Sequence, residues 1–178
     1  MFYETQVKDY VDLSPDLFDG DLQESIREQI LRNYSNKTTE DLGLVITVLE
    51  VLTIGEGFKL AEDPSRHYEV EFTLLTYKPE LHEVVEGDVS SVTNFGVFVN
   101  IGLLDGLIHL SQTMVDQVSF SNTGIILGSQ TGQTLKAEQH VRASIVAVSF
   151  KDIRNVKIGL TMRQPGLGAL EWLEKSSN

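Results

Sequence analysis

The sequence predicts two domains: an α+β domain in the first half and an all-β barrel in the second, with a long insertion and a short C-terminal helix. Apolar and polar residues alternate along 2–11 and 68–77, and a four-residue apolar repeat lies between these segments. Beyond residue 82, short strand-like segments are separated by glycines. Such segments favour a closed barrel, because closure removes exposed sheet edges.

The first half is predicted to be a small sheet that carries one amphipathic helix. Residues 2–11 form a strand, Ser14-Pro15-Asp16 forms a turn, and the helix follows over 21–33. The helix has an apolar stripe, an aspartate that can cap its start and an asparagine that can end it. The stripe consists of Leu22, Ile26, Ile30 and Leu31. The capping aspartate is Asp19 or Asp21, and the asparagine at the end is Asn33 or Asn36. We expect the stripe to pack inside this domain.

Two further segments complete the predicted sheet. Residues 44–52 are β-branched and apolar on both faces, which favours a central strand. Residues 68–77 alternate, so one of their faces is buried. Pro79 then ends the strand pattern, because proline cannot donate to a sheet. The predicted domains are therefore 1–81 and 82–178.

The second half is predicted to consist mainly of strands. A long insertion, 112–138, separates the third and fourth strands of the barrel, and a helix follows Pro165. The predicted strand segments are 84–92, 95–101, 106–110, a stretch near 117–128, 140–149 and 156–162.

Composition excludes several classes of protein. The chain has no cysteine, so disulfides and thiolate chemistry are excluded. The first residues lack the cationic start and apolar core of a signal peptide, and no apolar run has membrane-spanning length. We expect a cytoplasmic protein that does not contact a membrane.

The net charge of -12 is unevenly distributed. Residues 1–81 hold 7 basic and 17 acidic residues, a charge of -10, whereas residues 82–178 hold 7 and 9, a charge of -2. Six basic residues lie within 136–163: Lys136, Arg142, Lys151, Arg154, Lys157 and Arg163. Either the second half samples charge unevenly, or the acidic half faces protein while this cluster faces phosphate.

An aromatic platform is predicted on the barrel surface. If the valines around Phe98 point inward, alternation turns Phe98 outward, and a bulge at Gly96 can turn Phe95 to the same face. His109 lies outside on the next strand by the same alternation. The alternative is that both phenylalanines fill the core. We favour the platform, because the strand already carries inward β-branched residues.

The last strand predicts a basic face beside this platform. Lys157 and Arg163 alternate with the apolar residues of 156–162, and Arg142 belongs to the same basic cluster. Aromatic rings beside cations are typical of single-stranded nucleic acid sites, where bases stack on rings and cations neutralise phosphates.

Catalytic and metal sites have little support. Asp105, His109 and Ser111 lack the strand-to-helix elbow and oxyanion donors of a hydrolase. The four histidines are scattered and have no cysteine partners, so no metal site is expected. Gly55-Glu56-Gly57 lacks the later glycine and lysine of a phosphate loop, and no cofactor is expected.

Three spaced motifs carry a resemblance to a known module. They are Gly87-Asp88-Val89, Phe95-Gly96-Val97-Phe98-Val99 and Gly106-Leu107-Ile108-His109-Leu110-Ser111. Residues 82–163 resemble the five-stranded OB-fold RNA-binding module that is repeated in the largest small-subunit protein of bacterial ribosomes. The resemblance implies RNA contacts by Phe95, Phe98, His109 and Lys157. The acidic position of that site is occupied by Ser149.

The whole chain resembles the E-prime family of archaeal RNA polymerase subunits, the counterpart of the seventh subunit of the eukaryotic polymerases. The resemblance rests on the insertion, the N-terminal element order, Ile54-Gly55-Glu56-Gly57, Tyr77-Lys78-Pro79-Glu80 and 160–168. It implies a truncated RNP-like domain that docks on the polymerase core and on a helical partner, the F polypeptide of the same polymerase. Gly55, Glu56 and Gly57 would form the core-docking tip, although glycines flanking one acid also suit an ordinary hairpin.

This resemblance implies a non-catalytic subunit whose heterodimer with the F polypeptide forms a stalk beside the RNA exit path. Its barrel would catch single-stranded transcript. The competing hypothesis is a translation or RNA-decay factor that uses the same barrel, but such a factor would not need so acidic a companion domain. A third is a scaffold whose barrel hardly touches RNA.

Overall fold

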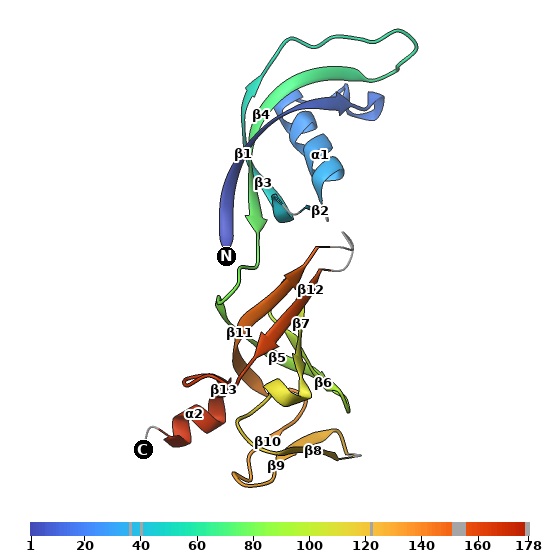
Figure 1. Ribbon diagram of the computed structural model, residues 1–178. Helices are drawn as coiled ribbons and strands as arrows, with labels where there is room; N and C mark the ends of the chain where they lie inside the picture. Colours follow the sequence, from blue (N-terminus) through green and yellow to red (C-terminus); the bar gives the residue numbers. More distant parts are fainter. Residues whose placement is uncertain (36, 40, 122, 151–155, 177–178) are drawn as a thin grey trace. The chain divides into compact units, whose positions relative to one another are not determined.

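The computed structural model describes residues 1–178 except 36, 40, 122, 151–155 and 177–178 (Figure 1). The chain forms two compact units, Met1–Lys78 and Pro79–Asn178. In the described part of the chain, no helix is both long enough and apolar enough to span a bilayer. The predicted fold class is confirmed: an α+β unit precedes a β-barrel with an added small sheet and a short final helix.

The first unit is a four-stranded antiparallel sheet in the order β1-β4-β3-β2, with α1 against one face (Figure 1). A short 3-10 helix, Pro15–Leu17, occupies the predicted turn. The elements are β1 (Phe2–Leu13), α1 (Leu22–Tyr34), β2 (Thr38–Thr39), β3 (Gly43–Ile54) and β4 (Arg66–Tyr77).

Helix α1 packs its predicted stripe on the sheet, with one exception. Ile26 and Ile30 are fully buried beside Phe72 of β4. Asp21 caps the helix, because its carboxylate accepts from the Glu24 N–H at 3.2 Å. Leu22, however, is 42% exposed. The prediction for Leu22 was wrong because the first residue of the helix lies a full turn before the buried stripe begins.

The helix ends with Ser35 as its C-cap, one of the positions between the two predicted asparagines. Asn33 lies inside the last turn of α1, and Asn36 lies outside the described residues. The apolar alternation predicted for β4 is confirmed, because Val70, Phe72 and Leu74 are all fully buried.

The pairing of β3 contradicts part of the prediction that residues 44–52 form a central strand. The strand pairs with β4 along most of its length, but on its other side only Gly43 and Leu44 pair, with the two-residue β2. From Val45 onward, no strand within the described residues covers that edge, and Leu49 and Leu52 are 41% and 43% exposed. The central-strand prediction was wrong for this part, because apolar composition does not reveal how long the neighbouring strand is.

The second unit contains a closed five-stranded barrel. The order β12-β7-β6-β5-β11 is closed by the pairing of β11 with β12. Strands β7 and β12 are parallel, and the other neighbours are antiparallel. The elements are β5 (Val84–Val92), β6 (Gly96–Asn100), β7 (Asp105–His109), β11 (His140–Ser149) and β12 (Lys157–Thr161).

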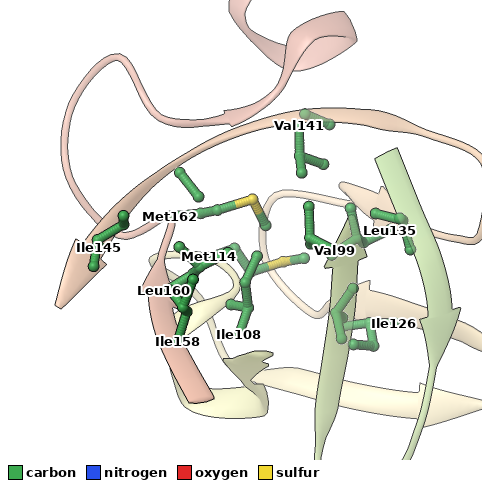
Figure 2. Close-up of a cluster of buried hydrophobic side chains, with 14 of the residues drawn as sticks. Val99, Ile108, Met114, Ile126, Leu135, Val141, Ile145, Ile158, Leu160 and Met162 are labelled. Atoms are coloured by element: carbon green, nitrogen blue, oxygen red, sulfur yellow. The ribbon is translucent and has the colours of Figure 1, made fainter. Parts of the chain in front are cut away.

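The insertion forms a small sheet that helps to close one end of the barrel core. Its strands are β8 (Val118–Ser121), β9 (Ile125–Gly128) and β10 (Thr134–Leu135), in the order β10-β9-β8. Ile126 and Leu135 are fully buried and lie in the same cluster as Val99 and Ile108 (Figure 2). The insertion is therefore part of the hydrophobic core.

The chain ends with β13 (Gly168–Ala169), which pairs with β11, and α2 (Leu170–Ser176). Leu167, just before β13, and Trp172 of α2 pack against the barrel core, so the predicted helix after Pro165 is present and lies on the barrel. Trp172 is the only tryptophan of the chain, so its fluorescence reports unfolding of this unit.

Truncating Ile126, a fully buried side chain of the insertion, should destabilise the barrel. We expect Ile126→Ala to lower the free energy of unfolding by about 2–5 kcal/mol, because it leaves a cavity in a packed core. The neighbouring Leu127 is 43% exposed, so Leu127→Ala should cost less than about 1 kcal/mol. Urea unfolding followed by Trp172 fluorescence measures both, and equal losses would show that the insertion does not belong to the core.

Candidate nucleic-acid interface

Strands β6 and β7 are held close together at Gly96. Gly96 lies opposite His109, and a Cβ at this position would lie 2.3 Å from the carbonyl oxygen of Ile108. A backbone atom cannot move away as a side-chain end can, so only glycine fits. Leu110 N–H also donates to the Phe95 carbonyl at 2.9 Å. This close approach sets the position of the two phenylalanines beside β7.

Phe95 and Phe98 form a ring pair on the barrel surface. Phe95 is 49% exposed and Phe98 is half-buried. Their ring centroids lie 6.0 Å apart with planes at 88°, an edge-to-face contact that holds each ring in place. Val97 and Val99 point into the core and are essentially fully buried. The exposed face of Phe95 is available to stack on a base.

His109 lies at the end of β7, exposed and opposite Gly96. Its Nδ1 accepts a hydrogen bond from the Ser111 N–H at 3.3 Å and lies 2.8 Å from Ser111 Oγ. Because Nδ1 is an acceptor, the proton of the neutral ring is on Nε2, which can donate to a ligand. Asp105 lies at the opposite end of β7, so it does not complete a triad with His109 and Ser111.

A shallow groove of about 740 Å³ runs along the barrel wall between β6, β7, β11 and β12. Its walls are mostly apolar, and its polar groups are few. The side chains that give it its chemistry are Phe98, Leu107, His109, Val146, Val148, Ser149 and Lys157. Three of the predicted site residues therefore meet in one groove, and Phe95 adjoins them through its contact with Phe98.

A bulge in β11 shapes the groove. The register of β11 against β12 shifts between Ile145 and Ala147, so Val146 is left unpaired and is 43% exposed. Lys157 is exposed and lies opposite Ser149 in the same ladder. Lys157 takes part in none of the ion pairs found among the described residues, so its ammonium group can neutralise a phosphate.

Arg142 lies elsewhere on the barrel. Its Nε donates to Glu86 at 2.8 Å, and it lines a separate hollow with Leu170 and Leu173 of α2. His140, two residues earlier on β11, lies 2.8 Å from Asp88. The structure therefore does not bring Arg142 into the groove, because β11 is long enough to reach two different surfaces.

Of the remaining predicted cations, Arg163 is placed by its hydrogen bonds. Arg163 is exposed just beyond β12, and its N–H donates to Thr161 Oγ1. Thr161 in turn donates to Gln112, a groove residue, at 2.8 Å. Arg163 thus lies close to one end of the groove without lining it. Lys151 and Arg154 lie outside the described residues.

Gly55, Glu56 and Gly57 lie in the exposed loop that joins β3 to β4. The Gly55 N–H donates to the Glu69 carbonyl at 2.8 Å, which continues the β3–β4 pairing into the loop. A Cβ on Gly57 would lie 2.5 Å from the Tyr68 ring, so the loop passes directly over that ring. The loop therefore has a defined base, and the exposed Glu56 lies close to it.

The sequence analysis missed several groove residues, among them Leu107 and Val146. Leu107 could have been found, because it shares the outward alternation of His109. Val146 could not, because an inward or outward position depends on a bulge that the sequence does not reveal. Within the described residues, no cluster of histidine and carboxylate groups is suited to hold a metal ion.

The barrel and its groove define the second unit as an RNA-binding-type barrel, and known families agree. Residues 78–158 match the S1 RNA binding domain family. Residues 8–64 match the family described as the SHS2 domain found in the N terminus of Rpb7p/Rpc25p/MJ0397. The two matches cover both units in the predicted order.

The relatives extend over the entire chain. The chain is 38% identical to DNA-directed RNA polymerase subunit Rpo7 of Sulfolobus acidocaldarius, over 98% of this chain and 96% of that protein. It is 39% identical to the Rpo7 subunit of Saccharolobus shibatae, over 99% of both chains. It is 34% identical to subunit RPC8 of the Saccharomyces cerevisiae RNA polymerase III, over 65% of this chain and 54% of that protein.

The chain belongs to the Rpo7 family of DNA-directed RNA polymerase subunits. The resemblance to the E-prime family is thereby confirmed. The chain is a non-catalytic subunit of a nucleotide-polymerising enzyme, so its partners include other polymerase subunits. The competing hypothesis of a translation or RNA-decay factor is not supported, because full-length similarity is to polymerase subunits.

The close approach at Gly96 can be tested by adding one methyl group. We expect Gly96→Ala to lower the free energy of unfolding of the barrel by about 1–3 kcal/mol, because its Cβ would overlap the Ile108 carbonyl. Asn94→Ala, in the exposed turn just before it, should change stability by less than about 0.5 kcal/mol. Trp172 fluorescence during urea unfolding measures both. If Gly96→Ala leaves the free energy of unfolding unchanged, β6 and β7 can move apart enough to accommodate the added methyl group.

Proposed function

We propose that this chain is the RNA-contacting stalk subunit of its polymerase, and that it forms a heterodimer with the F polypeptide and docks on the core enzyme. In this proposal the barrel holds single-stranded RNA as the transcript emerges. The observation that carries the proposal is the groove that combines Phe98, His109 and Lys157, with the exposed Phe95 at its rim.

The groove offers a distinct group to each part of a nucleotide. Phe95 provides a ring for base stacking, and Phe98 supports it edge-on. The Nε2–H of His109 can donate to a base edge, ribose or phosphate oxygen. Lys157 can pair with a phosphate. Because stacking does not depend on base identity, the expected binding is tolerant of sequence.

The expected affinity is weak and sensitive to salt. Few cations lie at the groove, and the chain carries a net charge of -12, which repels phosphates at long range. In the proposal Arg163 extends the path of the RNA beyond the groove end. Arg142, held by Glu86 on another surface, contributes to a phosphate contact only for RNA that continues past the groove.

Docking on the core is proposed for the first unit. This unit carries most of the negative charge of the chain, which makes it unsuited to RNA and suited to basic protein surfaces. The loop that joins β3 to β4 begins with Gly55, Glu56 and Gly57, and it presents the exposed carboxylate of Glu56 between two glycines. We propose it as the tip that enters the core.

Removing the rings should weaken RNA binding. We expect Phe95→Ala and Phe98→Ala each to reduce affinity for a labelled single-stranded RNA by about 5-fold to 150-fold, because stacking contributes about 1–3 kcal/mol per base. Fluorescence anisotropy measures the affinity, and Trp172 fluorescence verifies folding. Val115→Ala is the control, because Val115 is 68% exposed but lies outside the groove. If the double variant of Phe95 and Phe98 binds the RNA as tightly as the native chain, the two rings do not contact RNA and the barrel is a scaffold only.

Reversing the charge at the loop tip should disrupt core docking. We expect Glu56→Lys to lose retention on immobilised polymerase core by more than about tenfold, because a like charge opposite a basic site repels. Pairing with the F polypeptide should persist, as measured by co-elution. Glu4→Lys, an identical charge reversal on exposed β1, should keep core retention. If both variants bind the core as the native chain does, the tip is not the docking element.

A further inference from the structure

His67, at the start of β4, is a histidine with a carboxylate at each ring nitrogen. Only 7% of the residue is exposed. The register of β1 and β4 places Asp12 directly opposite, and His67 Nδ1 lies 2.5 Å from Asp12 Oδ1. On the other side, Nε2 lies 2.9 Å from Oδ2 of Asp63, a residue of the β3–β4 loop. The imidazole thus connects the sheet to the loop.

Phe58 holds the other strand of the loop against the same histidine. Its N–H donates to the His67 carbonyl at 3.0 Å, and the His67 N–H donates to the Phe58 carbonyl at 2.9 Å. The two rings stack, with centroids 5.5 Å apart and planes at 25°. Tyr10 of β1 packs edge-on against Phe58 at 6.1 Å. Phe58 directly follows the glycines of the proposed docking tip.

A protonated ring satisfies both contacts. A neutral imidazole has one N–H donor, so one of the two carboxylates would face a lone pair, whereas imidazolium donates to both. Burial lowers the pKa of His67, but the hydrogen bonds and charges of Asp12 and Asp63 outweigh burial and raise the pKa above its ordinary value. Asp63 is itself held by the Ser65 N–H at 2.8 Å, and its pKa is lowered.

Neighbouring charges do not compete for this ring within the described residues. Arg66 lies over the Phe18 ring at 5.0 Å, and Glu69, the next residue on the same face of β4, is paired with Lys8 at 3.5 Å. Asp12 and Asp63 are therefore the charged groups that face His67 from β1 and from the loop.

We propose that His67 is the positioning residue of the docking loop: as an imidazolium between Asp12 and Asp63, with Phe58 stacked on it, it fixes the loop over 55–65 in one conformation and releases it when deprotonated. The inference rests on the proposed role of this loop in core docking. We call the contact of protonated His67 with Asp12 and Asp63 the clamp. Because the pKa of His67 is raised on folding, the clamp is complete below the ordinary histidine pKa of about 6.5. It is lost as the pH rises through the pKa that His67 has in the folded protein.

The native full-length chain tests the pH dependence without any substitution. The ring protons of His67 and the Phe58 amide are followed by NMR between about pH 5 and pH 10. We expect both to shift with one common midpoint above about 6.5, because deprotonation of the ring releases the loop. A midpoint below 6.5, or a Phe58 amide that does not follow the ring, would overturn the inference.

Charge removal at constant pH tests the clamp itself. We expect Asp63→Asn and His67→Gln each to raise the rate of tryptic cleavage after Lys59, an exposed loop residue, by about tenfold, because local opening becomes more frequent. Glu62→Gln is the matched control: it removes the same charge from the adjacent position, which has no described partner, and should change the rate by less than about twofold. Equal rates for Asp63→Asn and Glu62→Gln would refute the clamp.

Retention on the polymerase core separates this inference from the proposed function. If Asp63→Asn accelerates cleavage and also weakens core retention by about threefold or more, both the clamp and the docking role of the loop are supported. If cleavage accelerates while retention stays unchanged, the clamp stands and the docking role fails. If neither changes, the clamp fails, and Glu56→Lys remains the independent test of docking.

Discussion

Closure of the barrel by β12 is the constraint on which the candidate RNA site depends. This strand pairs in parallel with β7 and antiparallel with β11, so it joins the two ends of an otherwise open sheet. Its pairing brings Lys157 to the wall that already holds Phe98 and His109, although the lysine lies far along the chain. The same closure buries Ile158 and Leu160 in the core, so stability and site geometry come from one set of contacts.

The first unit is organised differently, around an open sheet with one covering helix. Its core lies between α1 and one face of the sheet, while the long β3–β4 hairpin projects a loop beyond that core. Such a loop has few apolar contacts of its own, so polar contacts at its base have to restrict its conformations. His67 supplies them by linking β1, β4 and the loop. We infer that these polar contacts act together with the packing of Phe58 on His67 and Tyr10 to position the loop.

The incorrect predictions have one physical origin. Leu22 and the outer edge of β3 were both inferred from residue type and local period. Local period states which side chains share a face, but it does not state where a neighbouring element ends. Strand β2 is two residues long, so Leu49 and Leu52 remain exposed. Strand β11 extends past the groove, so Arg142 meets Glu86 instead of the aromatic rings.

The sequence by itself determined the local features of this protein. It predicted the bounds of β5 and β11 to the residue, the inward and outward alternation of β6 and β7, and the RNA polymerase family. Tertiary structure decided the groove at the β11 bulge, the separate surface of Arg142 and the contact of His67 with two carboxylates. The reason is that alternation and glycine positions act over neighbouring residues, whereas each of these features depends on the register between strands that are far apart in the chain.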